Sequence, residues 1–160
     1  MTQHVGELRE LQKIADEVRS GRRVILFPPG QAFFVIVIML SIAAFGLTTV
    51  FVSTALTSAL ELSVRANSQF FSVLLVVPLV VVPGIMITRG KKRFAAILRV
   101  SFLLYLLAAL VLIIRDILFL GSGSLPPFAL IIGLSLLGLW LSYRPGFILY
   151  CEFFYLVKRP

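Results

Sequence analysis

The feature that most constrains this chain is the stretch Gln31–Leu60, which contains no charged side chain. A transmembrane helix needs about 20 predominantly apolar residues to cross a hydrocarbon layer of ~30 Å. The stretch exceeds that length and is followed directly by Glu61. It therefore predicts a membrane-spanning helix near the start of the chain.

Three further apolar runs follow, so the chain is predicted to cross the membrane several times. Hydrophobic residues make up 59% of the sequence and charged residues 14%, against about 45–50% and about 25% in soluble domains. We expect an all-α, polytopic helical membrane protein with four transmembrane helices. Their predicted ranges are about 32–60, 70–88, 94–114 and 128–143.

The expected spans divide the chain into three parts. Residues 1–30 are predicted to form a cytoplasmic amphipathic helix and an interfacial linker, and residues 31–143 the transmembrane bundle. Residues 144–160 are predicted to form a C-terminal interfacial tail. Its apolar run 147–157 is too short to cross again and too apolar to lie in water, so it should lie in the interface or fold back against the bundle. Glu152 in this tail is expected to be neutralised by Arg144 or by a basic residue of the 89–93 loop.

The segment before the first span has the pattern of an amphipathic helix. Leu8, Leu11, Ala15 and Val18 follow 3-4-3 spacing and share one helix face. This face is a candidate docking surface for a partner or a sister subunit. The alternative is a helix lying on the membrane surface, but such helices usually carry a strongly cationic polar face, whereas acidic and basic residues are nearly balanced here.

Two other features lie within the predicted spans. Thr49, Ser53 and Thr57 form a hydroxyl stripe at i+4 steps, which favours either a pore lining or close helix packing. Proline removes a backbone hydrogen bond and bends a helix. The second predicted span therefore has an expected kink, which can act as a hinge, open a ligand cavity or be purely structural; its residues are Pro78, Pro83 and Gly84.

Basic residues predict the orientation. The loop between the second and third spans contains Arg89, Lys91, Lys92 and Arg93. By the predicted boundaries, 13 of the 15 lysines and arginines lie on one side of the membrane, and only Arg65 and Arg115 on the other. The positive-inside rule then places both termini in the cytoplasm. We expect a multi-pass protein of the plasma membrane, or of the inner membrane if the source is bacterial.

The sequence offers little catalytic chemistry. It has one cysteine and one histidine, and it contains no glycine-rich phosphate loop or catalytic carboxylate pair. We expect no enzyme activity, no cofactor, no metal and no nucleic-acid partner. The predicted function is a non-catalytic integral membrane subunit that oligomerises, anchors a membrane or cytoplasmic partner protein, or does both. The alternative is an oligomeric pore or channel lined by the hydroxyl stripe.

Overall fold

The computed structural model describes residues 2–22, 24–57, 67, 74, 77–119 and 125–158, and all secondary structure assigned within them is helical. The expected all-α class is thus confirmed. The elements are α1 (Thr2–Arg19), α2 (Gln31–Thr57), the π-helical turn η1 (Val77–Val81), α4 (Val82–Thr88), α5 (Phe94–Phe119), α6 (Leu125–Ser142) and α7 (Pro145–Lys158).

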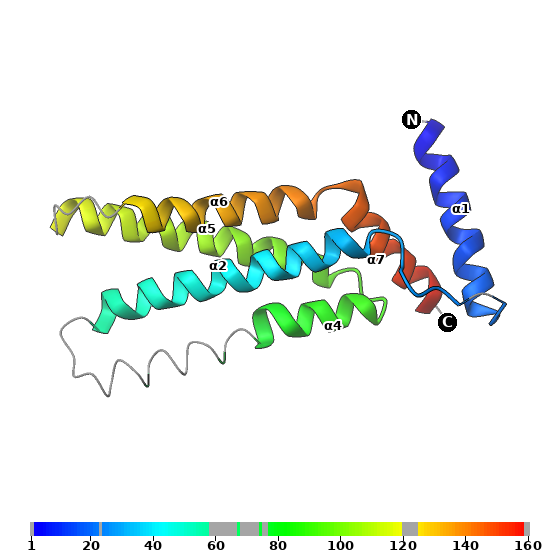
Figure 1. The fold of residues 1–160 in the computed structure, drawn as a ribbon, viewed down its shortest axis with the longest axis horizontal. Helices are drawn as coiled ribbons and strands as arrows, with labels where there is room; N and C mark the ends of the chain where they lie inside the picture. The colour runs from blue at the N-terminus through cyan, green and yellow to red at the C-terminus, as the bar shows by residue number, and fades with distance from the viewer. Residues whose placement is uncertain are drawn as a thin grey trace.

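Helices α2, α5 and α6 form an elongated bundle, with α4 alongside α2 and α5 (Figure 1). Large apolar side chains also cover the outside of this bundle. Met39 is 63% exposed, Leu107 59% and Leu118 69%. Apolar surface on this scale is not stable in water, and a helix satisfies its own backbone hydrogen bonds in lipid. The bundle therefore has the surface of a helical membrane protein.

The number of candidate spans is smaller than expected. Among the described residues, two helical segments are long and apolar enough to cross a membrane alone: Gln31–Ala55 and Phe94–Leu118, of 25 residues each. A third is counted only if Pro127–Ser142 and Pro145–Lys158, which are bent by 55°, form one broken span. The structure thus supports two or three spans rather than the four predicted.

The shortfall has two causes. Helix α6 has 18 residues and reaches only about 27 Å at 1.5 Å per residue, which is short for a hydrocarbon layer of ~30 Å. Six of the first seven residues of the predicted span 70–88 lie outside the described residues, and the remaining part includes an apolar helix, Pro78–Thr88, that is too short to cross alone. The third span was also predicted too short, because α5 continues through Arg115 and Asp116 to Phe119.

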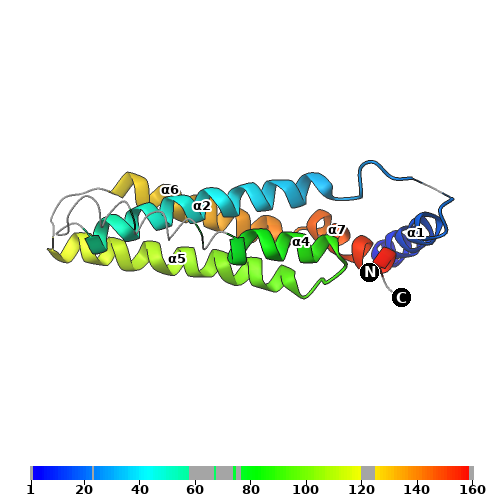
Figure 2. The same ribbon diagram turned by 90° about the horizontal axis from the view of Figure 1, so that it is seen from below.

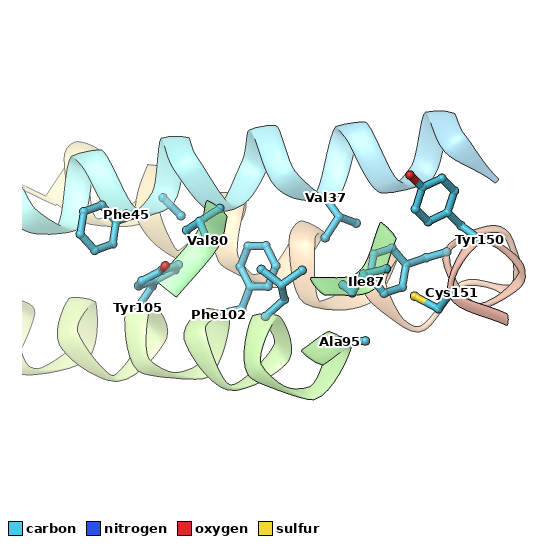
Figure 3. Close-up of a cluster of buried hydrophobic side chains, with 12 residues drawn as sticks. Val37, Phe45, Val80, Ile87, Ala95, Phe102, Tyr105, Tyr150 and Cys151 are labelled. Carbon is cyan, nitrogen blue, oxygen red and sulfur yellow. The ribbon is translucent and has the colours of Figure 1, made fainter. Parts of the chain in front are cut away.

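The core runs along the inside of the bundle and continues into α7 (Figure 3). Val37 and Phe45 from α2 face Phe102 and Tyr105 from α5. A further contact joins α5 to α6, since a side chain at Gly138 would overlap the Phe102 ring. The absence of a side chain at Gly138 thus lets the two helices approach closely.

The predicted kink residues fall at the junction of two helical forms. Pro78 lies in η1 and Pro83 in the first turn of α4. A π-helical turn is a common response to an interrupted i to i−4 hydrogen-bond ladder, which proline causes because it lacks an N–H. Pro83 and Gly84 are buried against the bundle.

Both ends of the described chain lie at the same end of the bundle (Figures 1 and 2). There, α7 turns away from α6 and packs against α1, α2 and α4, while α1 runs across the end of the bundle (Figure 2). The described part of the C-terminal tail is therefore a helix packed on the bundle, and its position at a membrane interface stays a prediction.

Candidate interaction surface

The predicted docking helix packs within its own chain. Helix α1 makes its main contacts with α7, and on its apolar face Leu11 and Ala15 are 5% and 2% exposed. Val18 is half-buried, and the side chain of Leu8 lies outside the described part. Part of the face proposed for an external partner is thus covered by α7.

The opposite face of α1 is exposed and carries charges of both signs. Glu10, Gln12, Lys13, Asp16 and Arg19 are exposed along it. A shallow hollow of about 580 Å³ lies at the end of this face, lined by Gln12, Lys13, Asp16, Glu17, Ser20 and Arg22. The hollow extends from the last turns of α1 to the start of the linker. Polar and charged side chains line it.

Helix α7 is held tightly on the bundle. Gly30 has a φ of +77°, a conformation that glycine adopts without strain, and a side chain there would overlap the Gly146 backbone. The next turn of α2 adds a stacked pair, because the rings of Phe34 and Tyr150 lie 4.3 Å apart. Close backbone contact and aromatic stacking therefore fix α7 against the start of α2.

An ion pair joins α7 to the loop before α5. Lys92 Nζ lies 2.9 Å from Glu152 Oε1 and 4.3 Å from the centroid of the Tyr155 ring. Of the two partners expected for Glu152, the structure selects the loop residue. Arg144 stacks instead on Trp140, 3.8 Å from the ring centroid.

Arg99 holds the bend between α6 and α7. Its Nη2 donates a hydrogen bond of 2.8 Å to the carbonyl oxygen of Ser142, the last residue of α6. The guanidinium also stacks 4.2 Å from the centroid of Tyr143, in the turn that follows. A cation at the C-terminus of a helix interacts favourably with the helix dipole and with the carbonyls that lack helical partners. This contact was not predicted from the sequence.

The hydroxyl stripe makes local hydrogen bonds. Thr49 Oγ1 donates to the carbonyl oxygen of Gly46, and Ser53 Oγ donates to that of Val50, each over 3.0 Å. Ser53 is buried, whereas Thr49 is half-buried. The side chain of Thr57 is outside the described part. The two described hydroxyls are thus engaged within their own helix.

Cys151 is unsuited to nucleophilic chemistry. It is 6% exposed, and burial raises the pKa of its thiol to about 12, a shift that Arg99 opposes and Glu152 reinforces. The thiolate is the reactive form of cysteine, so little of it exists at neutral pH. Within the described residues, no group of three or more His, Cys, Asp and Glu side chains is placed to hold a metal ion.

Comparisons with known proteins give no relative: no family model, no curated protein and no solved structure matches this chain.

Proposed function

We propose that this protein is a non-catalytic integral membrane subunit that anchors a partner protein through the exposed charged face of α1. The observation that carries the proposal is the burial of Leu11 and Ala15 against α7. Because these residues hold α1 on the bundle, its polar face points away from the membrane protein and is available to another molecule.

The mounting of α7 supports this role. The close contact of Gly30 with Gly146 and the ion pair of Lys92 with Glu152 join α7 to two separate points of the bundle. Helix α1 therefore rests on an element that is itself fixed. A preorganised surface loses less conformational entropy on binding than a free helix does, which favours α1 as a docking platform.

We also propose a topology of four spans with both termini in the cytoplasm of a plasma membrane, or of a bacterial inner membrane. In this arrangement, α4 and α6 belong to the additional crossings, and α7 lies at the interface. Both ends of the described chain lie at one end of the bundle, as this requires. The 89–93 loop and Arg144 lie at that same end, whereas Arg115 lies near the far end of α5.

We rank the oligomeric pore second. The described hydroxyls of the stripe donate to carbonyls of their own helix, an arrangement that suits helix packing and leaves fewer donors for a water-filled lumen. Ion flux into liposomes that contain the purified protein would favour the pore over the docking role.

Photocrosslinking in cells tests the docking face. A photoreactive amino acid is placed at Gln12, on the exposed face of α1, and separately at Met39, which is 63% exposed on the lipid-facing side of α2. We expect a discrete protein adduct from Gln12 and none from Met39. Lys13→Ala with Asp16→Ala should reduce the Gln12 adduct several-fold.

The mass of the adduct identifies the kind of partner. An adduct of twice the chain mass of 17.7 kDa would indicate a second copy, and any other discrete mass a different protein. If Gln12 gives no protein adduct while the protein is correctly inserted, the docking role of α1 is wrong.

A further inference from the structure

An apolar groove lies between α2 and α4. It has a volume of about 260 Å³ and is lined by Phe34 and Ile38 from α2 and by Val81, Gly84, Ile85 and Thr88 from η1 and α4. Gly84 forms its floor: a Cβ at this position would lie 3.3 Å from Ile38 Cδ1 and 3.8 Å from Phe34 Cζ. The absence of a side chain at Gly84 therefore keeps the groove open.

Three cations gather at one end of this groove. Arg89 follows Val81 and Ile85 at i+4 steps and ends α4, so it continues the line of the groove. Gly90 has a φ of +82°, and a Cβ there would lie 2.9 Å from Lys158 Cβ. The turn thus places the backbone of Gly90, and with it its neighbours Arg89 and Lys91, close to the backbone of Lys158, which lies 67 positions after Lys91 in the chain. The right-hand ends of α4 and α7 meet there in Figures 1 and 2.

The cation cluster has no acidic partner in the described part of the chain. The nearby carboxylate, Glu152, is paired with Lys92. Bringing like charges together costs free energy unless an anion offsets it. A negatively charged group of a ligand therefore suits the end of the groove, and an apolar part of the same ligand suits the groove itself.

The depth of the cluster indicates which ligand has both properties. Arg89 and Lys91 lie in the turn between the apolar helices α4 and α5, and basic residues at the ends of apolar helices are expected at the level of the lipid headgroups. The groove extends from this level along the apolar part of α4. A phospholipid has its phosphate at the headgroup level and its acyl chains directly beneath, and basic residues close to the surface attract anionic lipids.

We propose that the α2–α4 groove and the turn after α4 bind one anionic phospholipid. Arg89, Lys91 and Lys158 contact its phosphate, and one acyl chain lies over Gly84 between Phe34 and Ile85. This proposal does not depend on the partner-anchoring role of α1.

Native mass spectrometry of the delipidated protein in detergent tests the site. The probes are dioleoyl phosphatidylglycerol and dioleoyl phosphatidylcholine, which share acyl chains and differ in net charge. We expect the anionic lipid to bind more tightly to the wild-type protein. Arg89→Gln with Lys158→Gln should weaken its binding on the order of tenfold, since each basic residue near the surface contributes to attraction of the headgroup.

A charge-matched control separates a site from general attraction. Arg19→Gln with Arg22→Gln removes the same number of cations from the same end of the molecule, at exposed positions away from the groove. This control should bind the anionic lipid as the wild type does. Equal losses in both double variants would overturn the proposal, because the attraction would then be nonspecific.

Two further measurements test the groove itself. Ile85→Trp fills the groove from a position that is 46% exposed, and should weaken lipid binding several-fold without affecting insertion. Glycerol phosphate, which has the charge but no acyl chain, should compete poorly. If glycerol phosphate binds as tightly as the lipid, or if Ile85→Trp leaves lipid binding unchanged, the groove holds no acyl chain and the proposal is wrong.

Discussion

At the scale of single residues, the cations at the α1 end of the bundle have distinct structural roles. Lys92 pairs with Glu152 and lies over Tyr155, whereas Arg99 binds the last carbonyl of α6 and stacks on Tyr143. All of these contacts link segments that are more than 40 residues apart. Basic residues used to predict the membrane orientation therefore also help fix the position of α7.

The buried thiol of Cys151 gives a prediction about pH. The pKa of this thiol is raised to about 12 in the folded protein, against about 8.5 for a free cysteine. The folded state therefore retains the proton between these two values, and the contribution of Cys151 to stability is complete below about pH 8.5 and falls as the pH rises toward 12. We expect maleimide to label native Cys151 at about pH 8 on the order of 1,000-fold more slowly than the unfolded chain, because the thiolate fraction falls by about that factor.

Labelling rates are measured by intact mass, with and without denaturing detergent. A matched control moves the thiol to an exposed position, as Gln12→Cys in a Cys151→Ser background, which should label rapidly in the native protein. Equal labelling rates for Cys151 in the native and denatured states would contradict the burial of this face of α7.

At the scale of elements, contacts through glycine determine how closely the helices pack. On α6, Gly138 faces the Phe102 ring with no room for a side chain. A Cβ at Gly133 on the same helix would meet no other atom of the described chain within 4 Å. Packing thus requires glycine at position 138 but not at position 133 of the same helix.

These two glycines allow a matched comparison. Gly138→Ala should destabilise the bundle by about 1–3 kcal/mol, because overpacking forces the Phe102 ring or the α6 backbone to shift. Gly133→Ala should be neutral or slightly stabilising, since alanine favours the helix by up to about 1 kcal/mol over glycine. Unfolding of the purified protein in mixed micelles measures both variants. Equal effects would show that α6 does not pack on Phe102 as described.

At the scale of the whole molecule, the distribution of charge agrees with the placement of the chain ends. Most described basic residues belong to elements at the end of the bundle where α1 and α7 lie, whereas Arg115 is near the far end of α5. This placement suits the even number of crossings in the proposed topology.

Reporter fusions test the proposed topology. Fusions at residue 2 and at residue 160 should both report the cytoplasm, by the positive-inside rule. A reporter placed after Arg115, within the 120–124 segment, should report the opposite side. If the two terminal fusions report different sides, the number of spans is odd, and α6 with α7 would have to be reconsidered as a single broken span.

Some properties of this protein follow from the sequence alone. The uncharged run from Gln31 predicts a spanning helix, because a backbone in lipid must satisfy its own hydrogen bonds. The apolar tail 147–157 is predicted to leave water without crossing the membrane, because of its length and composition. The loop of four cations predicts which helix ends share a side. Each of these predictions depends on local composition, which the sequence displays directly.

Other properties were decided only by the tertiary structure. Periodicity identified the apolar face of α1 but not its neighbour, and α7 of the same chain covers Leu11 and Ala15. Both Arg144 and the 89–93 loop were compatible with Glu152, and the direction in which α7 leaves α6 brought Lys92 within 2.9 Å. The same bend placed Lys158 beside Gly90. These outcomes depend on the packing of segments that are distant in the chain. Close contacts at Gly30, Gly90 and Gly138 set the path of the backbone, and local composition does not encode such contacts.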